Sequence, residues 1–320
     1  MNTASHPAAA GTPSGGAFGS RVLFASLVTA AFAALAWADW CGLGGAAPAW
    51  WLLPVAVALA LGGVVEMAGL FAARGIGLPQ PPLAAAVIGM VLAAAAGGGV
   101  FGGRATESPA VALGWAAAAA VAGFVGLGTL EIARYRPQGA ALERLAAGAL
   151  VIVFLGLPLA CIVGLRLIRR EPSAAGPGGS APADMLPLVT LVAVTKAGDI
   201  AAYLGGTLCG RHRMAATLSP GKTWEGAAAS LTGSVATAWL LLEGMAGAAV
   251  AGPWGGWLVF GAGVGLAGML GDLAESLLKR ECGAKDSGRM LGGLGGCLDL
   301  IDSLLFAAPV AWVLWSVGRS

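Results

Sequence analysis

The stretch Trp254–Asp302 reads WGGWLVFGAGVGLAGMLGDLAESLLKRECGAKDSGRMLGGLGGCLDLID, an apolar run that passes directly into a cluster of charged residues. A helix of about 20 mostly apolar residues can cross a bilayer, so this run predicts a membrane-spanning segment. The rest of the chain agrees, because 58% of the 320 residues are hydrophobic and only 11% are charged. A mean hydropathy of +0.82 excludes an ordinary soluble domain.

We therefore expect an all-α polytopic membrane protein with about nine transmembrane helices. The predicted spans are Val22–Trp40, Trp50–Ala73, Pro82–Phe101, Val111–Ala133, Leu145–Leu167, Met185–Leu208, Ala227–Leu242, Trp254–Leu278 and Leu298–Val317. Residues 1–20 are expected to form a disordered tail, because they lack both an apolar core and a basic start. Residues 21–184 would then form the N-terminal membrane helices, and residues 185–320 a C-terminal membrane domain that carries the chemistry.

The distribution of basic residues predicts the orientation. With the N-terminus in the cytoplasm, twelve Lys and Arg residues fall in cytoplasmic segments and five on the other side, while Lys196 lies within a span. The segment Arg169–Asp184 is the main exception and is interpreted as a flexible linker. The five cysteines are scattered without a CxxC pair, which argues against a disulfide framework or a zinc site.

Charge is costly in a chain that dissolves in lipid, so the charged cluster predicts a functional site. Its members are Asp272, Glu275, Lys279, Arg280, Lys285, Asp286, Arg289, Asp299 and Asp302. Helical spacing puts Asp272, Glu275, Ser276 and Lys279 on one helix face, and a glycine-rich segment leads into a helix that begins near Asp299 and Asp302.

Two acidic helix ends that face each other would bind Mg²⁺, and nearby cations would neutralise a transferring phosphoryl group. This pattern predicts phosphoryl or nucleotidyl transfer. Simpler interpretations remain for single residues: Lys279 and Arg280 could anchor a helix at the cytoplasmic surface, and Asp299 and Asp302 could cap a helix.

Ser276–Asp302 resembles the signature of the phosphatidate cytidylyltransferase (CDP-diacylglycerol synthase) family. That signature reads S-x-apolar-K-R, four residues, K-D-x-small, two residues, apolar, P/G, any, H-G-G, apolar, any, D-R-apolar-D. Matching positions are Ser276, Lys279, Arg280, Lys285, Asp286, Gly288, Leu291, Gly292, Gly295, Gly296, Asp299 and Asp302. Three positions depart from it: Leu294 stands for the family's His, Leu300 for its Arg and Cys297 for an aliphatic residue.

An upstream segment is similar to the same family, so the resemblance covers roughly residues 195 to 310. The family's D-x-x-A-Y-x-x-G stretch corresponds to Asp199, Ala202, Tyr203 and Gly206. Its basic loop and S-P-x-K-T-W-E-G run correspond to Arg211 and to Ser219–Gly226. The N-terminal half matches only in being hydrophobic.

The resemblance implies that CTP and phosphatidic acid react to give CDP-diacylglycerol and pyrophosphate, with Mg²⁺ as cofactor. It implies metal ligands at Asp272, Asp299 and Asp302, and catalytic roles for Lys279, Arg280, Lys285 and Asp286. Substrate binding is expected from Asp199, Tyr203, Ser219, Lys222 and Ser276. Lys196 would meet the anionic headgroup or extend to the interface.

We expect an integral protein of the bacterial inner (cytoplasmic) membrane, with its active site facing the cytoplasm and no nucleic-acid partner. A homodimer is left open. Two alternatives to the main hypothesis also stay open: a cytidylyltransferase for another lipid phosphate, and a non-catalytic membrane scaffold or transporter.

Overall fold

The computed structural model describes residues 30–45, 47–101, 109–137, 139–168, 185–245, 252–284, 287–288 and 296–318. The predicted tail and the linker at residues 169–184 lie outside them. The elements are a helix over residues 30–40, a 3₁₀ turn Leu43–Gly45, α2 (Leu53–Ala73), α3 (Gln80–Gly97), α4 (Pro109–Ala133), α5 (Ala141–Val151), a π turn Ile152–Gly156, α6 (Leu157–Arg166), α7 (Leu186–Cys209), β1 (Arg213–Ala215), β2 (Ser219–Thr223), α8 (Trp224–Trp239), a π turn Leu240–Met245, α9 (Gly256–Glu281) and α10 (Cys297–Val317). The predicted all-α class is confirmed, with one small antiparallel hairpin added.

Seven helical segments in the described part of the chain are long and apolar enough to cross a membrane: Leu53–Ala73, Gln80–Gly97, Ala110–Ala133, Ala141–Arg166, Leu186–Cys209, Gly256–Glu281 and Cys297–Val317. Each coincides with a predicted span, and the ends differ by a few residues. The two other predicted spans correspond to the helix over residues 30–40 and to α8 with its π turn. The chain is therefore an integral membrane protein, and the total of nine spans stays a prediction.

The span formed by α5 and α6 contains a proline without being broken. Pro158 has no N–H and would crowd the carbonyl four residues earlier in a regular α-helix. The π turn Ile152–Gly156 ends two residues before Pro158 and widens the helix at that point. One continuous segment of 26 residues, Ala141–Arg166, results.

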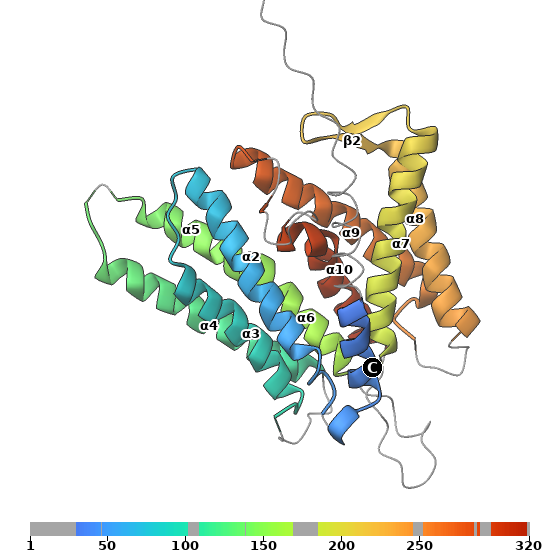
Figure 1. Cartoon of the computed structure of the whole chain (residues 1–320), viewed down its shortest axis with the longest axis horizontal. Helices are drawn as coiled ribbons and strands as arrows, with labels where there is room; N and C mark the ends of the chain where they lie inside the picture. Colours follow the sequence, from blue (N-terminus) through green and yellow to red (C-terminus); the bar gives the residue numbers. More distant parts are fainter. Residues whose placement is uncertain are drawn as a thin grey trace, which may run out of the picture.

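Helix α10 connects the two halves of the protein. Its first turns, with Leu298, Ile301 and Leu305, belong to one buried core with residues of α2, α3 and α6. Its later turns, with Trp312 and Trp315, belong to a second buried core with residues of α6, α7, α8 and α9. In Figure 1, α10 accordingly lies between the group of α2 to α6 and the group of α7 to α9. The last helix of the chain is thus part of both cores.

Helices α7, α8 and α9 meet at small residues. A methyl group on Gly198 of α7 would lie 2.5 Å from Ser234 Oγ of α8, and one on Gly265 of α9 would lie 2.7 Å from the same atom. The Ser234 hydroxyl donates a hydrogen bond to the Val194 carbonyl at 3.2 Å. Such small-residue contacts let helix backbones approach closely in a membrane.

The helix ends gather on two faces, as Figure 1 shows. The hairpin face holds β1, β2 and the C-terminal ends of α2, α7 and α9. There Arg74, which follows α2, donates to the carbonyl of Glu281 at 2.8 Å and to its carboxylate at 2.7 Å. The opposite face holds the ends of α6 and α10. There Arg166 donates to Asp39 Oδ2 at 2.6 Å, and both side chains are buried.

The two exposed cysteines allow the predicted orientation to be tested. Cys41 follows the helix over residues 30–40 on the opposite face, and Cys209 ends α7 on the hairpin face. In intact cells, a membrane-impermeant maleimide should label a protein that retains only Cys41. A protein that retains only Cys209 should be labelled only after permeabilisation. Labelling of Cys209 from outside intact cells would contradict the predicted orientation.

Candidate active site

A cavity of about 400 Å³ opens among α7, the hairpin, α8, α9 and α10. Its wall is formed by Lys196, Asp199, Ala202, Tyr203, Gly206, Met214, Gly221, Lys222, Thr223, Gly226, Ala227, Ser230, Met269, Asp272, Asp299 and Asp302. These residues come from two separate parts of the sequence, and both parts had been predicted to contribute to one site. The cavity joins six charged side chains to a mostly apolar surround.

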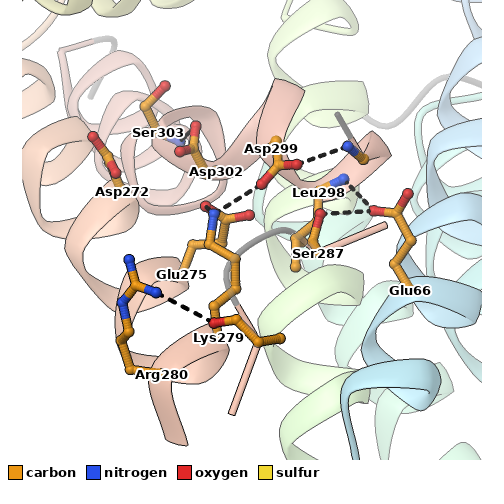
Figure 2. Close-up of polar contacts among 12 residues, drawn as sticks. Glu66, Asp272, Glu275, Lys279, Arg280, Ser287, Leu298, Asp299, Asp302 and Ser303 are labelled. Atoms are coloured by element: carbon orange, nitrogen blue, oxygen red, sulfur yellow. Dashed lines mark hydrogen bonds and ion pairs between the residues drawn. The ribbon is translucent and has the colours of Figure 1, made fainter. Parts of the chain in front are cut away.

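The acidic centre of the cavity forms where α9 and α10 touch. Ligand atoms of Asp272, Glu275 and Asp302 lie within 4.8 Å of one another. A methyl group on Gly271 would lie 2.5 Å from the main-chain oxygen of Asp302, so the missing side chain lets the two helices meet there. Figure 2 shows the three carboxylates between the two helices.

Lys279 joins the acidic centre to the start of α10 (Figure 2). Its ammonium group lies 2.7 Å from Glu275 Oε2 and 2.8 Å from Asp299 Oδ1. The other oxygen of Asp299 accepts the Gly296 N–H at 2.7 Å. Asp299 is therefore both a helix cap and the partner of Lys279, while it also lines the cavity.

The hairpin brings Lys222 to the cavity. Lys222 lies at the end of β2, and its Nζ is 2.8 Å from Asp272 Oδ2. Thr223 caps α8 by accepting the Gly226 N–H at 3.1 Å. The predicted S-P-G-K-T-W-E-G motif is thus a strand followed by a helix cap, and this turn fixes the position of the lysine.

Glu225 ties the hairpin to the end of α7. Its carboxylate accepts the N–H groups of Arg211 at 3.1 Å and His212 at 3.2 Å, and it lies 2.6 Å from His212 Nδ1. The hydrogen bond from the His212 ring, together with these backbone N–H groups, lowers the pKa of Glu225 to about 2. Glu225, the acidic residue of the motif, therefore stabilises the connection between α7 and the hairpin and does not line the cavity.

A second polar group lies deeper along α7. Lys196 Nζ is 3.1 Å from Asp199 Oδ2, 3.1 Å from Ser303 Oγ and 3.3 Å from the Leu300 carbonyl. Ser303 also donates to Asp199 at 2.9 Å. Lys196 lines the cavity, where these contacts hold it toward α10. Tyr203, also on the cavity wall, is 73% exposed and so lies at its rim.

Other predicted site residues lie elsewhere. Arg280 donates to the Leu218 carbonyl at 3.3 Å and so contacts the hairpin turn beside the cavity. Ser219 pairs with Ala215 within the hairpin, and Ser276 is half-buried on α9; neither lines the cavity. Lys285 and Asp286 lie outside the described residues, so their roles stay predictions.

Two acidic residues received no role from the sequence. Glu275 is 1% exposed and belongs to the acidic centre, although the sequence had placed it on the right helix face. Glu66 of α2 is 4% exposed and accepts hydrogen bonds from residues at the start of α10. A usable signal existed, since Glu66 is the only charged residue in the predicted span Trp50–Ala73.

The acidic centre fits Mg²⁺. Glu275 Oε1 is buried and has no hydrogen-bond partner among the described residues. Buried polar atoms normally have a partner, and a bound cation would supply one here. Around the cavity, the carboxylates of Asp199, Asp272, Glu275, Asp299 and Asp302 outnumber the ammonium groups of Lys196, Lys222 and Lys279. Among these described residues the excess is two formal negative charges, which one divalent cation would balance. Oxygen ligands of this kind suit Mg²⁺.

Comparison with known proteins agrees with the predicted resemblance. Phosphatidate cytidylyltransferase of Brucella melitensis is 41% identical over 145 residues, which are 43% of this chain and 50% of that protein. The enzyme of the same name from Mycobacterium bovis is 34% identical over 166 residues, 52% of this chain and 49% of that protein. Uncharacterized protein YnbB of Escherichia coli is 43% identical over 122 residues, 38% of this chain and 39% of that protein.

The chain spans about half the length of the curated phosphatidate cytidylyltransferases that it matches. The sequence model of the cytidylyltransferase family, in contrast, matches residues 19–317, nearly the whole chain. That match includes the N-terminal helices, where the sequence had suggested no similarity beyond hydrophobicity. The chain therefore belongs to the cytidylyltransferase family.

Proposed function

We propose that this protein transfers CMP from CTP to phosphatidic acid and forms CDP-diacylglycerol and pyrophosphate. The observation that carries the proposal is the acidic centre of Asp272, Glu275 and Asp302. It lies at a hairpin-face cavity that Lys196 and Lys222 line, and Lys279 pairs with Glu275 beside it. Carboxylates for a hard cation, together with ammonium groups for phosphates, are what nucleotidyl transfer requires. Membership of the cytidylyltransferase family supports the same reaction.

In the proposed reaction a phosphate oxygen of the lipid attacks the α-phosphorus of CTP. A new P–O bond forms, the bond from the α-phosphorus to the bridging oxygen breaks, and pyrophosphate leaves with the electron pair. The attacking phosphate is already ionised, so little proton transfer is needed. Positioning and charge neutralisation should supply most of the rate.

The residues divide this work between them. Asp272, Glu275 and Asp302 would hold Mg²⁺, which when bound neutralises negative charge on the triphosphate. Lys222 lies near the end of β2 and forms an ion pair with Asp272, and from there its ammonium group can contact the CTP phosphates. Lys279, held by two carboxylates, keeps Asp299 and Glu275 in place and adds positive charge near the leaving group.

The lipid would reach the cavity from the side. On α7 the side chains of Ile200, Tyr203 and Leu204 are exposed, as expected of a surface in contact with lipid. Tyr203 also lines the cavity, so the rim of the site and the lipid-facing surface share a residue. Lys196 lies on the same helix and would meet the phosphate of a lipid that enters there. We place the protein in the inner membrane with the hairpin face in the cytoplasm, where CTP is available.

The direct test is CMP incorporation into lipid by the purified protein. Radiolabelled CTP, Mg²⁺ and detergent-dispersed phosphatidic acid should yield labelled CDP-diacylglycerol and an equal amount of pyrophosphate. A panel of other lipid phosphates decides between the main proposal and a cytidylyltransferase of different substrate preference. A purified, folded protein without turnover on any of these lipids would defeat the proposal and favour a scaffold or transporter.

Neutralising the acidic centre should abolish turnover while the protein stays folded. We expect Asp272→Asn, Asp302→Asn and Glu275→Gln each to lower kcat by about 100-fold or more, because each removes a proposed Mg²⁺ ligand. Glu143→Gln, an exposed carboxylate on α5, is the control and should keep parental kcat. Steady-state rates at saturating CTP are the measurement. Near-parental rates in any of the three variants would remove that residue from the proposed ligands.

Replacing Lys222 should weaken the use of CTP. Lys222→Met removes an ammonium group from the cavity wall, so kcat/KM for CTP should fall by about 100-fold or more. Lys222→Arg keeps the charge and should recover part of the loss. The measurement is the rate as a function of CTP concentration at fixed lipid. An unchanged kcat/KM in Lys222→Met would show that the nucleotide phosphates bind elsewhere.

A further inference from the structure

Glu66 is a buried carboxylate in the middle of the protein that the proposed reaction does not use. It belongs to α2, in the N-terminal half, and it is 4% exposed. Oε1 accepts the Cys297 N–H at 2.7 Å, and Oε2 accepts the Leu298 N–H at 2.8 Å. The Ser287 hydroxyl donates to Oε2 at 3.3 Å. Figure 2 shows Glu66 beside Ser287 and Leu298, across from the acidic centre.

These contacts hold the first turn of α10. The first N–H groups of a helix have no partner within the helix, and here carboxylates from two directions accept them. Asp299 accepts the Gly296 N–H from within α10, and Glu66 accepts the next two N–H groups from α2. Asp302 lies about one turn further along the same helix. Any shift of this helix end therefore moves Asp302 relative to Asp272.

The backbone around Glu66 is shaped to its carboxylate. A methyl group on Gly288 would lie 2.7 Å from Glu66 Oε1, and one on Gly296 would lie 2.5 Å from Glu66 Oε2. Both glycines belong to the family-like signature, and both have the Glu66 carboxylate where a side chain would be. The absence of side chains at Gly288 and Gly296 thus leaves the space that the Glu66 carboxylate of α2 occupies.

Helix α2 also contacts the other end of the segment that joins α9 to α10. Arg74, two turns after Glu66, donates to the carbonyl and the carboxylate of Glu281 at the end of α9. Glu66 holds the start of α10, so α2 and the residue that follows it contact both of the helices that carry the acidic centre.

We propose that Glu66 is a positioning residue of the active site: by holding the start of α10 it sets the distance between Asp302 and the carboxylates of α9. This inference rests on the proposed function, because it concerns how the same acidic centre binds its cation. Partners that orient metal ligands typically affect metal affinity or activity by about 10- to 100-fold. Loss of the Glu66 contacts should therefore weaken cation binding without removing any ligand.

The test is Glu66→Gln, measured by direct Mn²⁺ binding to the purified protein and by amide hydrogen exchange of the peptide that contains Cys297 and Leu298. The amide group of Gln offers one acceptor oxygen where the carboxylate offers two, so one backbone N–H loses its partner. We expect the Mn²⁺ dissociation constant to rise by about 10-fold or more, with faster exchange at this helix end. The Mg²⁺ concentration for half-maximal turnover should rise in parallel.

Glu131→Gln is the matched control. Glu131 is a similarly buried carboxylate in the N-terminal half, and its ion pair, at 2.6 Å, is with Arg144 of α5. It should lose thermal stability and keep parental Mn²⁺ affinity. If Glu131→Gln weakened Mn²⁺ binding as much as Glu66→Gln does, the effect of Glu66 would be a general loss of stability and the inference would fail.

Gly288→Ala provides a second variant should Glu66→Gln not fold. It leaves Glu66 in the chain and puts a methyl group against its carboxylate, so the same loss of Mn²⁺ affinity is expected. Parental Mn²⁺ affinity in a folded Glu66→Gln or Gly288→Ala protein would overturn the inference. If the parent lacks turnover, but the variants differ from it in Mn²⁺ affinity and hydrogen exchange as expected, the proposed function fails and this inference stands.

Discussion

A methyl group at Gly271 would lie 2.5 Å from the main-chain oxygen of Asp302, so α9 and α10 can touch there only because that side chain is missing. This contact governs the site, since Asp272 follows Gly271 directly and Asp302 supplies the opposing carboxylate. Further along, Gly198 and Gly265 bring α7 and α9 against Ser234 of α8 in the same way. The abundance of glycine in this chain therefore has a specific use, which is to let helices with charged residues approach each other.

The cost of charge in lipid explains how the remaining polar groups are arranged. On the opposite face, Asp39 and Arg166 form a buried pair that is formally neutral. At the hairpin face, the carboxylates outnumber the ammonium groups around the cavity, and Glu275 keeps a buried oxygen without a partner among the described residues. Buried charge is thus balanced within the protein on the opposite face, whereas the hairpin face keeps an excess of negative charge among the described residues. This imbalance is the reason for proposing a cation at the acidic centre.

The sequence predicted the helices from local patterns, and it predicted most of the cavity wall from local patterns together with the family resemblance. Apolar runs located seven spans to within a few residues, and helical spacing put Asp272, Glu275 and Lys279 on one face. Contacts between distant segments could not be predicted in this way. The link from Lys222 to Asp272 depends on a hairpin that hydrophobicity does not reveal, and the contact of Glu66 with Cys297 joins residues 231 positions apart. The sequence also left open whether Asp299 is a cap or a metal ligand; its contact with the Gly296 N–H shows that it caps α10, and its role as a metal ligand stays a prediction.

The separation of Glu66 from its partners also bears on how the protein is made. At ordinary rates of synthesis, roughly 10 to 50 s pass between the appearance of α2 and that of α10. During this interval the nascent chain carries an acidic group meant for the interior of the membrane, while the backbone amides that will satisfy it are still on the ribosome. Insertion of the last helix both removes that penalty and completes the acidic centre. A chain that ends before α10 would therefore keep an acidic side chain in the membrane without these two backbone partners.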